Sequence, residues 1–108
     1  MKKKLIPEEV TEQALRAIDR FNQTELKGTG CAFVARFQGR FLYLDREESG
    51  EVGPICRLEY RGGKKGWEFA IYKYSSGRYD PEEWMFPGSE LVDGTILGAM
   101  KAGMSAYE

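Results

Sequence analysis

The sequence predicts an α+β fold in which a helix, a four-stranded antiparallel β-meander and a C-terminal helix follow one another, with the helices packed mainly on one sheet face. Three observations predict it. Apolar residues repeat at helical spacing near both ends of the chain, and four segments between them alternate apolar and polar residues. Short glycine-containing turns join these segments. With 108 residues the chain forms a single domain, residues 1–108, which is large enough to fold without a metal or disulfide.

The first helix is expected over residues 7–21. Pro7 suits the first helical position, where its missing N–H costs nothing, and Glu8 and Glu9 lie at the positive end of the helix dipole. The polar residues 22–30 contain glycine and end the helix. One apolar stripe is formed by Val10, Ala14, Ala17, Ile18 and Phe21.

Residues 31–37 and 40–47 are expected to form the first hairpin, because Gly39 allows a two-residue turn between them. Alternation in the first of these strands gives a shared face to Cys31, Phe33, Ala35 and Phe37. The second strand leaves two alternatives open. The pairs that compete for the interior are Phe41 with Tyr43 and Leu42 with Leu44.

Strands three and four are expected over residues 55–61 and 67–74, after a loop at 49–54 and with a flexible connection at 62–66. One face of this pair carries Cys56, Leu58, Tyr60, Trp67, Phe69 and Ile71. The other face carries Arg57, Glu59, Arg61, Glu68, Ala70, Tyr72 and Tyr74.

The C-terminal third is expected to contain one helical turn and one helix. Asp80 is placed to cap the turn, with Pro81 at its first position. Asp93 is placed to cap a helix that runs from Gly94 or Thr95 to about residue 107. The turn with Tyr79, Trp84 and Phe86 is expected to close one end of the sheet. The predicted core comprises Val10, Ile18, Phe33, Leu58, Phe69, Ile71, Ile96 and Met100.

The middle of the chain resembles small uncharacterised prokaryotic α+β domains that have a helix followed by a four-stranded antiparallel sheet. The resemblance rests on the opening helix, the strand at 55–60, the short hairpin and the strand at 67–72. It covers residues 14–80. This chain departs from those domains where they continue with a Trp-His ending, because it has Arg78-Tyr79-Asp80 and no histidine. The resemblance implies a fold and no activity.

The absence of histidine excludes the commonest catalytic and metal-binding designs. No Ser-His or Cys-His pair can form, and no imidazole is present to bind zinc or iron. We therefore expect no catalytic residue, no metal site and no cofactor. A net charge of −1 argues against bulk attraction to nucleic acid or anionic lipid.

Cys31 and Cys56 are the two cysteines, 25 residues apart and both in apolar strand-like segments. We expect buried, reduced thiols, since a disulfide requires the two strands to place them side by side. The N-terminus has no signal-peptide pattern, and no segment has the ~18 apolar residues that a membrane span needs. These observations favour the cytoplasm and no membrane partner.

One candidate binding face consists of Arg57, Arg61, Tyr72 and Tyr74, which Arg36 extends from the first strand. Arginine and tyrosine on an exposed sheet are typical of single-stranded nucleic-acid platforms, where bases stack on rings. The alternative is an ordinary solvated sheet face. Glu59, Glu68 and the net charge favour this alternative, so nucleic acid is possible but not favoured.

A second candidate is a small-residue stripe on the last helix, formed by Gly98, Ala102 and Ala106. Small residues let another backbone approach closely, either within the monomer or in a symmetric dimer. The acidic residues near Trp84 are a third candidate, as carboxylates of an unrecognised enzyme, although helix caps explain most of them. The favoured hypothesis is a non-enzymatic protein-interaction or self-associating domain, with a homodimer or another protein as its partner.

Overall fold

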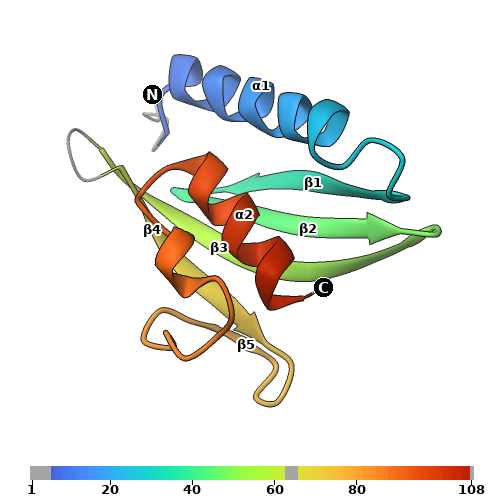
Figure 1. Ribbon diagram of the computed structural model, residues 1–108. Coiled ribbons are helices and arrows are strands. Elements are labelled where there is room, and N and C mark those ends of the chain that lie inside the picture. Colours follow the sequence, from blue (N-terminus) through green and yellow to red (C-terminus); the bar gives the residue numbers. More distant parts are fainter. Residues whose placement is uncertain (1–5, 63–65, 108) are drawn as a thin grey trace.

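The computed structural model describes residues 6–62 and 66–107 (Figure 1). The chain order is α1 (Glu8–Thr24), β1 (Cys31–Gln38), β2 (Phe41–Glu48), β3 (Glu51–Gly62), β4 (Gly66–Lys73), β5 (Arg78–Asp80), the 3-10 helix η2 (Ser89–Leu91) and α2 (Ile96–Ala106). The predicted α+β class is confirmed. Within the described residues the antiparallel sheet has five strands in the order β1-β2-β3-β4-β5, so the predicted number of four is wrong.

Both helices lie against the same face of the sheet, as predicted (Figure 1). Leu42 and Leu44 of β2 are fully buried on this face, which settles the competition in the first hairpin in their favour. Seven of the eight predicted core residues are buried, and Val10 is half-buried against the same core. Alternation therefore places Phe41 and Tyr43 on the face that no helix covers.

The β2–β3 hairpin is longer than predicted. Its turn consists of Ser49 and Gly50 alone, and pairing continues to Glu48 opposite Glu51, so most of the expected loop at 49–54 is strand. A β-bulge interrupts the register after Leu44. Because the bulge inserts one extra residue, two consecutive residues of β3, Ile55 and Cys56, are both buried.

The segment after β4 differs most from the prediction. Tyr79 lies in β5, opposite Tyr72, rather than in a closing turn. Residues 81–85 contain no helix: Asp80 accepts a hydrogen bond from the Glu82 N–H at 3.0 Å, a local turn that no helix continues. The rings of Trp84 and Phe86 pack on Phe69, at 6.1 and 5.8 Å between centroids, on the helix-covered side of β4.

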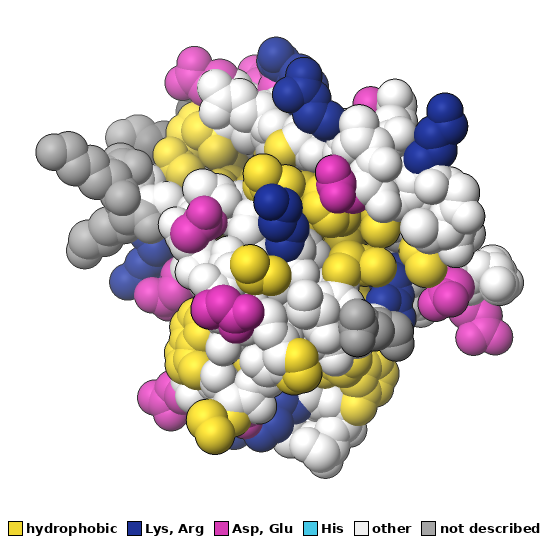
Figure 2. All heavy atoms as spheres, in the orientation of Figure 1, with side chains coloured by type: hydrophobic (Ala, Val, Ile, Leu, Met, Phe, Trp, Pro, Cys, Tyr) yellow, Lys and Arg dark blue, Asp and Glu magenta, His cyan; other side chains and the backbone are white. Residues whose placement is uncertain are grey.

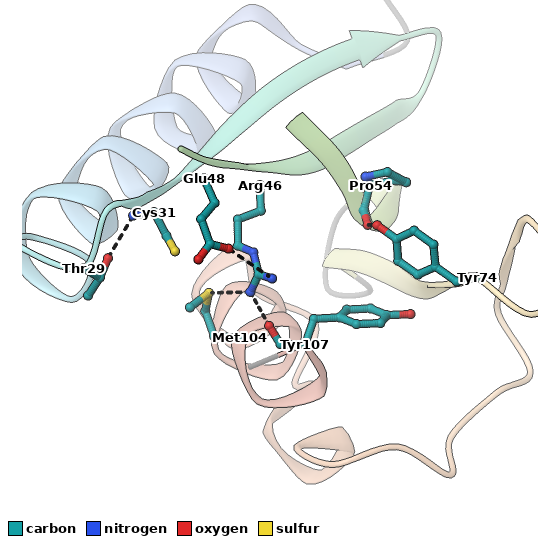
Figure 3. A network of polar contacts seen from close by, with 8 residues as sticks. All are labelled: Thr29, Cys31, Arg46, Glu48, Pro54, Tyr74, Met104 and Tyr107. Carbon is teal, nitrogen blue, oxygen red and sulfur yellow. Dashed lines mark hydrogen bonds and ion pairs between the residues drawn. The ribbon is translucent and has the colours of Figure 1, made fainter. Parts of the chain in front are cut away.

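Polar contacts at both ends fix α2. Its N-cap is Thr95, whose hydroxyl accepts from the Gly98 N–H at 3.0 Å, whereas the expected cap Asp93 accepts from the Thr95 N–H at 3.1 Å. At the other end Arg46 donates to the carbonyl oxygen of Tyr107 (Figure 3). Across the described ranges, no helix combines the length and apolar character that crossing a bilayer requires.

Cys31 and Cys56 are free thiols. The register explains why they do not pair, because Cys31 lies opposite Glu48 and Cys56 lies opposite Leu44. Cys56 is fully buried, and burial raises the pKa of its thiol far above the usual range. This cysteine therefore packs as a small apolar residue.

Candidate functional site

The face of the sheet opposite the helices carries a connected group of aromatic and arginine side chains. The strand register builds it, because Tyr43 of β2 lies between Arg36 of β1 and Arg57 of β3, and Tyr72 of β4 lies opposite Tyr79 of β5. Directly paired residues point to the same side of a sheet. We call this group the open face; it consists of Arg36, Phe41, Tyr43, Asp45, Arg57, Tyr72 and Tyr79.

Arginine side chains stack on the rings of the open face. The guanidinium carbon of Arg57 lies 4.6 Å from the ring centroid of Phe41 and 5.5 Å from that of Tyr79. Arg36 lies 4.6 Å from the ring centroid of Tyr43. All three distances are within the range of cation–π attraction, which favours keeping each guanidinium on its ring.

Tyrosine rings extend the open face to the end of α2. The ring of Tyr72 contacts those of Tyr79 and Tyr74 edge-on, at 5.0 and 4.9 Å between centroids. Tyr74 then contacts Tyr107 at 5.5 Å, and its hydroxyl donates to the carbonyl oxygen of Pro54 at 3.1 Å (Figure 3). Edge-to-face pairs stabilise their ring positions beyond simple burial, so these side chains are held in place before any partner binds.

A buried carboxylate lies among these rings. Asp45 is only 8% exposed, and its Oδ2 accepts from Arg36 Nε at 3.0 Å. Its Oδ1 is buried without a hydrogen-bond partner among the described residues. The hydrogen bond that Arg36 donates to Asp45 raises the pKa of the Arg36 guanidinium. Burial, and then the charge of Asp45, raises the pKa of the Tyr79 phenol. Both groups therefore keep their protons near neutral pH.

The four residues predicted as a binding face are not equivalent. Arg57 and Tyr72 belong to the open face, and Tyr74 adjoins it. Arg61 lies toward the Gly62 end of β3, away from Tyr72, and pairs with Glu59 at 3.3 Å. Its charge is thus partly offset within the chain, because Arg40 approaches the same carboxylate at 3.9 Å.

Sequence reasoning missed four members of the open face: Phe41, Tyr43, Asp45 and Tyr79. Phe41 and Tyr43 were one of two alternatives for the interior. The hydroxyl of Tyr43, which Leu42 and Leu44 lack, is the signal that could have placed the Phe41 and Tyr43 pair outside. Tyr79 was assigned to a closing turn. No sequence signal marks a three-residue strand such as β5, whose pairing depends on β4 beside it.

The small-residue stripe of α2 packs within the chain. Ala102 is fully buried, and a Cβ added at Gly98 would come within 2.6 Å of the carbonyl oxygen of Leu91. Ala106 is half-buried beside the core. The close approach that these residues permit is therefore used by the monomer itself.

Three of the acidic residues near Trp84 have structural partners. Asp80 and Asp93 accept local backbone hydrogen bonds, and Glu83 pairs with Lys73 at 2.8 Å. The hydrogen bond from Lys73 lowers the pKa of Glu83. Residues 6–62 and 66–107 contain no cluster of three or more Cys, Asp or Glu side chains that could hold a metal ion.

Comparisons with protein-family models, with curated proteins and with solved structures find no match to this chain. The resemblance to small prokaryotic domains therefore stays a prediction. The geometry of the described residues is the remaining basis for a function.

Proposed function

We propose that this protein is a non-enzymatic protein-interaction domain that binds its partner through the open face. The observation that carries the proposal is the connected layer of Phe41, Tyr43, Tyr72 and Tyr79 with Arg36 and Arg57 stacked on it. Tyrosine and arginine are enriched in protein interfaces and among the residues that dominate binding energy.

The layer is prepared for binding because its side chains already contact one another. Arg57 lies on two rings, and Tyr79 contacts the rings of both Tyr43 and Tyr72. Ordering a free, rotamer-rich side chain costs about 0.5–1.5 kcal/mol in an interface. Side chains that are held in advance avoid much of that cost, which favours recognition by a second protein surface.

The charges of this region support a protein partner over nucleic acid. Arg36 pairs with the buried Asp45, and Arg61 and Arg40 both approach Glu59, at 3.3 and 3.9 Å. A nucleic-acid platform needs cations that are available to phosphates. Here Arg36 has a carboxylate of its own, Arg40 and Arg61 share that of Glu59, and Arg57 lies within 5.5 Å of two ring centroids.

A photo-crosslinking amino acid at Val34 tests the proposal, because Val34 is exposed on the open-face side of β1. The matched control carries the same amino acid at Leu15, which is exposed on α1. We expect a discrete protein adduct from Val34 in cells that express the domain, its loss when Tyr43→Ala is added, and no such adduct from Leu15. Equal adducts from both positions, or none from Val34, would contradict the proposal.

Anisotropy titration with a labelled single-stranded oligonucleotide tests the alternative of nucleic-acid binding. Salt-sensitive binding that both Arg57→Ala and Tyr72→Ala weaken would favour nucleic acid over a protein partner. We expect no such binding.

The two free thiols suit the reducing cytoplasm, which we propose as the location where the protein acts.

A further inference from the structure

A groove between α1 and α2 is a second surface that exposes apolar side chains to solvent. It encloses about 390 Å³ and is lined on its apolar side by Ala17, Phe21 and Leu97. Leu97 is 47% exposed there. A neighbouring hollow of about 330 Å³ shares Ala17 and Leu97 and continues to Trp67. Figure 2 shows apolar surface along the line between the two helices, with basic side chains on both sides of it.

The rim of this groove is basic. Arg16, Arg20 and Lys101 line it, against a single carboxylate, Glu25. Arg16 meets Glu12 at 3.5 Å, in an exposed pair that contributes little. In the part of the chain that the structure describes, Arg20 and Lys101 form no ion pair. The groove therefore suits an apolar segment that carries negative charge.

The chain itself presents such a segment from the end of β5 through η2. Residues 80–91 contain four carboxylates and no lysine or arginine. Met85 at its tip is 93% exposed, and Trp84 is 45% exposed. Glu83 pairs with Lys73, whereas Glu82 and Glu90 form no ion pair with any described residue. We call residues 80–91 the acidic loop.

We infer that two copies of the chain associate by placing the acidic loop of each in the helical groove of the other. Exposed Trp84 and Met85 match the apolar floor around Leu97, and Glu82 and Glu90 match the rim of Arg20 and Lys101. The inference rests on this complementarity of apolar surface and charge sign within one chain.

The position of the two surfaces favours a closed dimer. The acidic loop lies on the helix-covered side of the sheet, since Trp84 packs on Phe69, and the groove lies between the helices on that same side. A two-fold axis between the surfaces brings each groove opposite the partner's loop, so both contacts form at once. The lysines at positions 2–4 have the same sign as the rim, which argues against the N-terminal segment as the occupant.

The inference is independent of the open-face proposal, because the groove and the acidic loop share no residue with the open face. Charge reversal tests it in the full chain. The groove variant carries Arg20→Glu and Lys101→Glu, and the loop variant carries Glu82→Lys and Glu90→Lys. A control variant with Lys27→Glu and Arg78→Glu makes the same change in net charge as the groove variant, at exposed positions outside both surfaces.

Light scattering behind size exclusion, at concentrations up to high micromolar, gives the oligomeric state. We expect a wild-type dimer that salt weakens, and a dissociation constant raised at least tenfold in the groove variant and in the loop variant alone. An equimolar mixture of these two variants should regain the dimer, because each reversed groove then meets a reversed loop. The control variant should dimerise like the wild type, and so should Tyr72→Ala of the open face.

Three results would overturn the inference. They are a wild-type chain that stays monomeric at high micromolar concentration, groove and loop variants that dimerise as well as the wild type, and a mixture that does not regain the dimer. The circular dichroism of each variant checks that it is folded. A monomeric wild type whose groove binds an acidic helical peptide would assign the groove to another protein and would also refute self-association.

Discussion

The ring of Tyr79 on β5 contacts the ring of Tyr43 on β2, with 5.3 Å between centroids, although β3 and β4 lie between their strands. Ala70 occupies β4 at this level, opposite Arg57 of β3, and it is buried although no helix covers this face. A small residue under the rings lets a tyrosine from the edge strand lean across the sheet. The short β5 is thereby coupled to the middle of the open face.

Replacing Tyr79 with alanine should destabilise the fold and disorder the open face. The substitution removes ring contacts with Tyr43 and Tyr72 and the stacking of Arg57, at an expected cost of roughly 2 kcal/mol in the free energy of unfolding. Urea denaturation measures this loss of unfolding free energy. Tyr79→Phe keeps the ring and should lose less than about 1 kcal/mol. Equal losses in both variants would show that the hydroxyl, rather than the ring, makes the contribution.

Alkaline pH should weaken the fold through Tyr79. Burial raises the pKa of its phenol, so the folded chain holds this proton more tightly than the unfolded chain does. The corresponding stability is complete below the unfolded pKa of about 10 and is lost as the pH rises through the higher folded value. Unfolding free energies between about pH 8 and 11 should fall less steeply in Tyr79→Phe than in the wild type. Parallel pH dependences would contradict this assignment.

The long elements were predictable because their patterns are local. Glu8–Thr24 shows a clear helical repeat, and the strands that begin at Cys31 and Gly66 alternate as expected. Alternation alone did not predict which face of the strand at 41–48 is buried, since both Phe41 with Tyr43 and Leu42 with Leu44 are apolar sets. The packing of the helices selects the aliphatic pair, because the other pair contains a tyrosine hydroxyl that is better placed near water.

The open face was predictable only in part for a related reason. Arg57 and Tyr72 follow from alternation in two adjacent strands. Tyr79 and Asp45 do not, because one lies in a three-residue strand and the other beside a bulge that depends on the partner strand. Residues 80–84 of the acidic loop are predicted as a helical turn because Asp80 and Pro81 have the right spacing. Exposed Met85 and the packing of Trp84 depend on tertiary contacts that spacing does not encode.

Glycine at position 98 should be required for the packing of α2. An added Cβ would meet the carboxylate of Asp93 and come within 2.6 Å of the carbonyl oxygen of Leu91. Gly98→Ala gains about 1 kcal/mol of helix propensity, and we expect the backbone clash to outweigh it and leave a net loss of roughly 1–2 kcal/mol. Gly103→Ala should also be destabilising, because its Cβ would come within 2.6 Å of the Cγ2 methyl of Ile55, a buried β-branched side chain with little freedom to move. Thermal unfolding compares the two, and a stabilised Gly98→Ala would be the contrary result.

Asn22 should hold α1 to the outer edge of the sheet. Its side-chain Nδ2 donates to the carbonyl oxygen of Phe33 at 3.0 Å, and its Oδ1 accepts from the Phe33 N–H at 2.8 Å, as a neighbouring strand would do. Asn22→Ala leaves both partly buried backbone groups without these bonds, at an expected cost of about 2–3 kcal/mol. Hydrogen exchange of the Phe33 amide is the direct readout and should accelerate in this variant. Gln23→Ala is the control, because the exposed Gln23 side chain donates to Asp19 on its own helix and its loss should leave Phe33 protected. Unchanged exchange at Phe33 in Asn22→Ala would mean that β1 keeps its edge closed without α1.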